Sequence, residues 1–172
     1  MARYLFFVSE LYAFAILRPL QAAIRARGEE VAWFFERADL ARFLRSEEVR
    51  LHTVSDVRRW NPSAVFVPGN WVPDFFPGLK VEVFHGFNVG KRSDERGHFR
   101  VRGWFDLYCT QGPATTEPFR ELAARHGYFR VAETGWPKLD PLFDGTYRHV
   151  EPERPTVLFA STFTERISAA RT

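Results

Sequence analysis

Residues 4–35 read YLFFVSELYAFAILRPLQAAIRARGEEVAWFF and are the clearest guide to the fold. The runs at 4–8 and 31–35 are short and apolar, as buried strands are. Residues 11–27 between them have helical character and end at Gly28, a common residue just past the end of a helix. A strand, a helix and a strand in this order predict a βαβ unit with parallel strands.

The same alternation continues along the chain. Apolar runs predict further strands, and the amphipathic or polar stretches between them predict helices. The predicted strands are Val49–Val54, Ala64–Val67, Val81–Phe84, Phe105–Thr110 and Arg130–Glu133, and the predicted helices are Ala38–Arg45, Asp56–Trp60 with Ser55 as its cap, and Ala114–His126. About six such units predict an α/β fold with a Rossmann-like, mostly parallel sheet.

The carboxyl-terminal part predicts the start of a second domain. Residues 1–143 account for the Rossmann-like domain, and residues 144–155 are polar and rich in turn-forming residues, as a linker is. A new strand pattern begins at Thr156 and runs on toward the last residues. Residues 156–172 are therefore expected to begin a second domain that is truncated.

Composition narrows the class of protein. The chain has 172 residues, of which 45% are hydrophobic, enough for one core and too many for a disordered chain. The net charge of +3 rests on Arg, because Lys occurs only at positions 80, 91 and 138. Guanidinium groups suit phosphorylated substrates or an anionic membrane surface. Codon usage explains the same bias equally well, and basic residues that alternate with acids argue against nucleic-acid binding.

Several side chains are expected to have no chemical role. Cys109 is the sole cysteine and lies in an apolar run, which favours a small buried core residue over a nucleophile. Four histidines occur at no metal-ligand spacing and are expected on the surface, namely His52, His98, His126 and His149. Neither a metal nor a cofactor is predicted. No secretory signal and no membrane span are apparent, which predicts a cytoplasmic protein.

His85 is the best-placed candidate for chemistry. In open parallel sheets, ligands gather beyond the carboxyl ends of the strands, and His85 follows a predicted strand directly. An imidazole there can accept a proton near neutral pH, as a general base must, although a histidine that only caps the sheet end is an equal alternative. Gly86 allows a ligand to approach closely, and Lys91 with Arg92 could neutralise a phosphate or form a solvated basic loop.

Two other strand ends carry polar candidates. Ser9 precedes the first predicted helix, where amide donors and the helix dipole favour anions. Gln111 follows a later strand and is a candidate for acceptor contacts, although a turn with Pro113 at the helix start is the ordinary explanation. Neither Gly-x-Gly-x-x-Gly nor the Walker pattern occurs, which disfavours dinucleotide oxidoreductases and P-loop nucleotidases.

Three segments between Phe84 and Asp140 stand in a characteristic order and spacing. They are Phe84-His85-Gly86-Phe87-Asn88-Val89-Gly90-Lys91, Phe105-Asp106-Leu107-Tyr108-Cys109-Thr110-Gln111-Gly112 and Thr134-Gly135-Trp136-Pro137-Lys138-Leu139-Asp140. Together they resemble the CDP-glycerol glycerophosphotransferase family, whose members build or prime teichoic-acid-like and capsular polymers. A fourth segment, at Thr156–Phe163, resembles the opening strand of that family's second domain, with Ser161 in place of a proline and with Thr162 matching a substrate-binding position.

The resemblance implies the amino-terminal, acceptor-side domain of a GT-B fold, followed by a nucleotide-binding domain. His85 would deprotonate an acceptor hydroxyl, which attacks the glycerol-bearing phosphorus of CDP-glycerol and expels CMP. Lys91 would offset charge nearby. The acceptor would end in glycerophosphate or a sugar, and the enzyme would work at the cytoplasmic face of the membrane. Because the second domain is expected to carry another essential histidine, residues 1–172 alone are predicted to have negligible activity.

Other functions fit the same features. A GT-B glycosyltransferase or a sugar-nucleotide 2-epimerase relative shares the domain plan and the cleft. A non-catalytic α/β binding module or degenerate remnant is the alternative from another class, and it predicts no effect of replacing His85. Truncation would also leave apolar patches exposed, at the aromatic loop Trp71–Phe76 and at the face meant to meet the second domain, which predicts self-association through that interdomain face.

Overall fold

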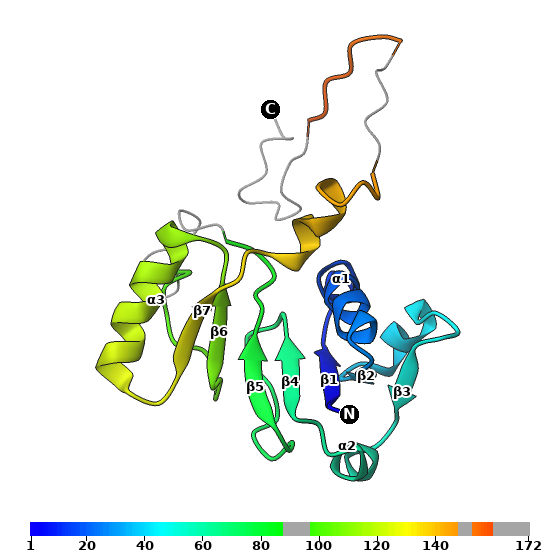
Figure 1. Ribbon diagram of the computed structural model, residues 1–172, viewed down its shortest axis with the longest axis vertical. Coiled ribbons are helices and arrows are strands. Elements are labelled where there is room, and N and C mark those ends of the chain that lie inside the picture. The colour runs from blue at the N-terminus through cyan, green and yellow to red at the C-terminus, as the bar shows by residue number, and fades with distance from the viewer. Residues whose placement is uncertain (88–96, 148–152, 160–172) are drawn as a thin grey trace.

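The computed structural model describes residues 1–87, 97–147 and 153–159, and its centre is a seven-stranded sheet (Figure 1). Every neighbouring pair of these strands is parallel, so the α/β class and the Rossmann-like sheet are confirmed. The strands are β1 (Arg3–Val8), β2 (Glu30–Phe35), β3 (Val49–Leu51), β4 (Ala64–Val67), β5 (Leu79–Glu82), β6 (Leu107–Thr110) and β7 (Arg130–Glu133).

The strand order indicates where a ligand is expected to bind, at the middle of the sheet. The order is β3-β2-β1-β4-β5-β6-β7, so the chain builds outward from β1 in one direction and then in the other. In sheets of this doubly wound type, ligands bind beyond the carboxyl ends of the strands where the order reverses. The crevice is therefore expected between the ends of β1 and β4.

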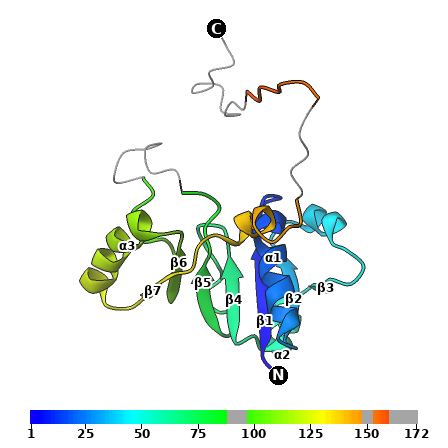
Figure 2. The same ribbon diagram turned by 45° about the horizontal axis from the view of Figure 1, so that its top comes forward.

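Helices cover both faces of the sheet because each strand alternates its side chains between two apolar cores. On one face α1 (Ala13–Ala26) packs over Phe6 and Val8 of β1, with the 3₁₀ helix η1 (Ala38–Phe43) beside it. On the other face α2 (Val54–Trp60) and α3 (Pro113–His126) pack over the core that includes Leu5 and Phe7 of β1. After β7 the chain crosses the strand ends to the 3₁₀ helix η4 (Pro137–Leu142), which lies against α1 (Figure 2).

A buried ion pair fixes the segment that leads into β3. Glu48 accepts hydrogen bonds from Nε and Nη2 of Arg18 on α1, both at 3.0 Å, and from the side-chain amide of Gln21. The Gln21 oxygen in turn accepts from the indole of Trp33 on β2 at 2.7 Å. Burial favours a raised pKa for Glu48, but these donors and the Arg45 amide hold the pKa below its ordinary value.

Several element boundaries differ from the prediction. The segment predicted as a helix at Ala38–Arg45 is the 3₁₀ helix η1, and the third strand ends at Leu51 instead of Val54. The cap of α2 is Thr53 and not Ser55: the Thr53 hydroxyl accepts from the Asp56 amide at 3.1 Å, and the Asp56 carboxylate accepts from the Thr53 amide at 2.9 Å. This reciprocal pair is a capping box, which begins the helix two residues earlier than predicted.

Thr53→Ala is expected to lower the free energy of unfolding by about 1 kcal/mol, because an amide at the start of α2 loses its acceptor. Ser55→Ala, two residues away and exposed, is the matched control and should change stability by less than about 0.5 kcal/mol. Urea denaturation followed by circular dichroism measures both. Equal losses for the two variants would contradict the assignment of the cap.

The end of the described chain leaves apolar side chains in solvent. Val157, Leu158 and Phe159 are exposed and belong to no helix or strand, while residues 148–152 and 160–172 lie outside the described residues. In the aromatic loop, Trp71 and Phe75 are exposed whereas Val72 and Phe76 are buried, so the loop packs with only part of its apolar surface. No helix in the described part of the chain is long and apolar enough to cross a membrane.

Candidate functional site at the strand ends

The backbone turns sharply where β5 ends. The strand stops at Glu82, two residues before the predicted end at Phe84, because Phe84 has a φ of +57° and cannot continue a ladder. A bulky side chain in this left-handed region is strained, and such strain persists only where the surroundings enforce it. Here Phe84 is 1% exposed and packs against the rings of Phe87, His98 and Phe119.

His85 follows this turn and is held by two contacts. Its Nδ1 lies 3.0 Å from the carbonyl oxygen of Pro68, and its ring lies over the ring of Tyr12 at 5.1 Å between centroids. A carbonyl oxygen can only accept, so the neutral ring carries its proton on Nδ1. Nε2 is then the nitrogen with a free lone pair. The geometry suits a proton acceptor at the edge of the sheet.

Ser9 lies at the same edge, at the end of β1. A Cβ added to Gly69, the residue after Pro68, would be 3.1 Å from the Ser9 hydroxyl oxygen, so the segment after β4 packs tightly against the end of β1. His85 contacts that segment from the other side through Pro68. The ends of β1, β4 and β5 therefore meet around Pro68 and Gly69, at the crevice that the strand order indicates.

A buried polar cluster lies beneath this edge, on the α3 face of the sheet. Glu82 is 0% exposed, and neither of its carboxylate oxygens has a hydrogen-bond partner among the described residues. Burial raises the pKa of Glu82 well above its ordinary value, and this is only partly opposed by the charge of Arg102 and by the nearby Phe84 amide, which lies outside hydrogen-bond geometry. Arg102 is itself 8% exposed. Burial lowers the pKa of its guanidinium, and the attraction to Glu82 offsets only part of that lowering.

The prediction of a surface position for His98 is wrong. His98 is 7% exposed, and its Nε2 has no partner within the described part of the chain. Its ring packs among four phenylalanines, those at positions 84, 87, 99 and 119. Burial, together with the charges of Arg102 and His85, lowers the pKa of His98 to about 4, so the ring is neutral near pH 7. His52 and His126 are exposed as predicted, and His149 lies outside the described residues.

A segment from beyond β7 anchors the turn at Phe84. The indole Nε1 of Trp136 donates to the Phe84 carbonyl oxygen at 3.1 Å, where the chain crosses the strand ends toward η4 (Figure 2). This bond satisfies a carbonyl that the left-handed φ removes from the sheet ladder. Trp136 thus helps to hold the backbone that carries His85.

The remaining predicted site residues have different surroundings. A Cβ on Gly86 would meet no atom within 4 Å, so nothing in the described structure requires a glycine there. Gln111 is exposed just beyond β6. Lys91 and Thr162 lie outside the described residues. Cys109 is half-buried rather than fully buried, and burial raises the pKa of its thiol to about 11, which makes it a poor nucleophile.

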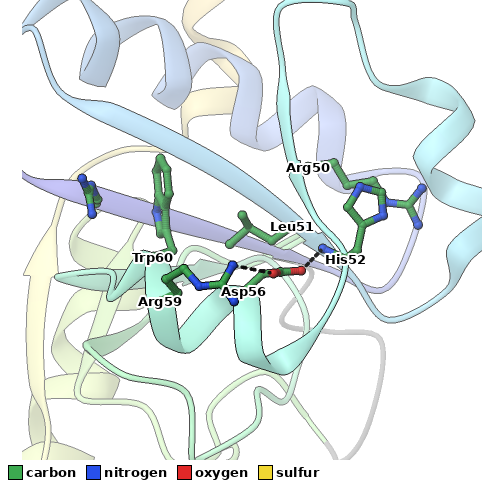
Figure 3. Close-up of a pocket in the computed structure, with 7 residues that line it drawn as sticks. Arg50, Leu51, His52, Asp56, Arg59 and Trp60 are labelled. Atoms are coloured by element: carbon green, nitrogen blue, oxygen red, sulfur yellow. Dashed lines mark hydrogen bonds and ion pairs between the residues drawn. The ribbon is translucent and has the colours of Figure 1, made fainter.

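A pocket of about 420 Å³ lies elsewhere, beside α2, the edge strand β3 and the start of β1 (Figure 3). Its charged groups largely pair with each other or with neighbours. Asp56 accepts from Arg59 at 3.5 Å and from the His52 amide at 3.2 Å, while Arg3 binds Glu30 outside the pocket. Arg50 lies over the Phe35 ring at 5.9 Å, and its Nε is buried without a partner among the described residues. None of the predicted site residues that the structure describes lines this pocket.

Sequence reasoning missed the buried cluster, although one signal was present. Glu82 is the only charged residue in the run Val81-Glu82-Val83-Phe84, and a carboxyl in such an apolar strand is unusual. Nothing local indicates that Arg102 and His98 join it from a later loop. In the described residues, no group of three or more His, Cys, Asp or Glu side chains could hold a metal ion.

The fold, the strand-end position of His85 and the buried cluster are thus observed directly in the described residues. The resemblance to a transferase family rests on the sequence segments alone. Comparison of the chain with protein-family models, with curated proteins and with solved structures finds no match in any of the three.

Proposed function

We propose that this chain is the acceptor-side part of a transferase in which His85 takes a proton from an acceptor hydroxyl. The observation that carries this proposal is the contact between His85 Nδ1 and the Pro68 carbonyl oxygen at 3.0 Å. It leaves Nε2 unprotonated, and an imidazole with a free nitrogen is the most frequent general base in enzymes. The strained Phe84 and the bracing by Tyr12 and Trp136 support it, because functional groups need rigid mounting.

The proposed reaction is transfer of glycerol phosphate from CDP-glycerol. The acceptor oxygen forms a bond to the glycerol-bearing phosphorus, the bond from that phosphorus to the CMP oxygen breaks, and the hydroxyl proton passes to His85 Nε2. The donor assignment rests on the motif resemblance around His85. Ser9, at the end of β1 beside the first turn of α1, is the residue proposed to contact an anionic group.

The proposal includes a second domain that supplies the nucleotide site. The exposed apolar side chains at Val157, Leu158 and Phe159 support it, since exposed apolar side chains that lie together mark surfaces that pack against another domain or chain. Catalysis needs donors arranged around the transition state as well as a base. The acceptor-side part alone is accordingly proposed to have negligible turnover.

The test is CMP release from CDP-glycerol with a glycerophosphate-ended acceptor, using the protein at its natural length with any sequence that follows Thr172. His85→Ala is expected to lower the rate by at least about 10²-fold, the low end for loss of a general base. His52→Ala, which removes an exposed histidine after β3, is the matched control and should keep the wild-type rate.

The outcomes separate the parts of the proposal. A His85→Ala rate equal to wild type would show that His85 is not the base. If wild type releases no CMP from CDP-glycerol but turns over a sugar nucleotide, the donor assignment is wrong and the assignment of the site stands. Absence of turnover with every donor would favour the non-catalytic binding module.

A further inference from the structure

The segment after β4 has a second point of attachment, through Asn70. This residue is exposed, yet its side-chain oxygen accepts a hydrogen bond from Nε of Arg102 at 2.8 Å. Its neighbours Pro68 and Gly69 are buried, and Gly69 packs against Ser9. The three residues are therefore held by packing on the β1 side and, on the other side, by this hydrogen bond and by the backbone of Gly103, where an added Cβ would lie 3.5 Å from the Asn70 carbonyl oxygen.

Arg102 is a rigid donor for this bond. Its backbone amide donates to the Tyr108 hydroxyl at 2.8 Å, and that hydroxyl donates back to the Arg102 carbonyl at 2.7 Å. The guanidinium also donates to the Arg100 carbonyl at 3.2 Å and lies over the Phe84 ring at 5.2 Å. Because both its backbone and its side chain are fixed, Arg102 can hold Asn70 in one place at a small further loss of entropy.

The anchor at Asn70 lies close to the Pro68 carbonyl along the chain. Only Gly69 separates the two residues, and glycine leaves the backbone unusually free to rotate. Without an anchor at Asn70, the Pro68 carbonyl could rotate away from His85. An unconstrained neutral imidazole prefers its proton on Nε2, so loss of the carbonyl acceptor would move the proton off Nδ1.

We propose that Asn70 is a positioning residue: through its bond to Arg102 it holds the Pro68 carbonyl against His85 and so keeps Nε2 of His85 unprotonated. The meaning of this tautomer for catalysis rests on the proposed function, in which Nε2 is the base. The tautomer itself is a property of the folded chain. It is measurable without any substrate.

The experiment is ¹⁵N NMR of the chain with labelled histidine, at about pH 8.5, two units above the ordinary imidazole pKa of about 6.5. The His85 signals are assigned by their loss in His85→Gln. Wild type is expected to give a protonated signal at Nδ1 and an unprotonated signal at Nε2. In Asn70→Ala the two shifts should move toward each other as the other tautomer becomes populated.

Two variants separate positioning from a general loss of structure. Asn70→Asp keeps an acceptor for Arg102 and is expected to retain the wild-type signals. Asp74→Ala alters another exposed residue before β5, without a bond to Arg102, and should also change nothing. Wild-type signals in Asn70→Ala, or equal loss in Asn70→Asp, would overturn the proposal. Neither result depends on CMP release. The NMR experiment can therefore contradict this inference while the proposed reaction stands, and the reverse.

Discussion

Glu82→Gln is expected to make the protein increasingly more stable than wild type as the pH rises. The carboxyl of Glu82 is fully buried without a hydrogen-bond partner among the described residues, and burial raises its pKa well above the ordinary value of 4.5. Above pH 4.5 the unfolded chain therefore loses this proton while the folded chain keeps it, so higher pH favours unfolding. Protonated Glu82 contributes its full share of the stability below pH 4.5. That contribution is lost as the pH rises through the pKa of Glu82 in the folded protein.

The measurement is the free energy of unfolding in urea from pH 5 upward, for wild type and for Glu82→Gln. The difference between the two should grow by about 1.4 kcal/mol per pH unit until Glu82 ionises in the folded protein. A constant offset from the new amide does not affect this slope. Glu121→Gln, which removes a carboxyl from the exposed side of α3, controls for net charge. If the free energies of unfolding of wild type and Glu82→Gln change in parallel with pH, then Glu82 is already ionised in the folded protein and pairs with Arg102.

Gly78→Ala is expected to destabilise the fold by roughly 2–5 kcal/mol, the sum of a left-handed backbone penalty and a steric clash. Gly78 precedes β5 and has a φ of +85°. An added Cβ would collide with the carbonyl oxygen of Pro62 and lie 2.8 Å from the carbonyl carbon of Ser63. These are backbone atoms at the start of β4, and they cannot move without disturbing the pairing of β4 with β5.

Gly28→Ala isolates the backbone part of that penalty. Gly28 follows α1 with a φ of +74°, but an added Cβ there meets no atom within 4 Å. It should lower the free energy of unfolding by only about 1–2 kcal/mol. Urea denaturation of both variants gives the comparison, and equal losses would show that the Pro62 contact relaxes without effect.

The edge of the sheet that carries the candidate site was predictable because it follows from local patterns. Apolar runs separated by helical stretches predicted parallel strands, and parallel strands send their carboxyl ends to one edge. Ser9 and His85 were selected on that basis, and both lie there. Gly86 was selected because it lets backbone or a ligand approach closely, and this stays a prediction: the space around it is open in the described structure.

The sequence alone determined the α/β class, the order of the strands along the chain and the strand-end position of His85, since these depend on residues close in sequence. The tertiary structure decided the tautomer of His85, the left-handed turn at Phe84 and the burial of Glu82, Arg102 and His98. Those features involve contacts between residues far apart in sequence. His85 and Pro68 are 17 residues apart, Trp136 and Phe84 are 52 apart, and Arg102 and Asn70 are 32 apart. No local pattern encodes such pairs, because they form only when packing brings separate strand ends and loops to the same place.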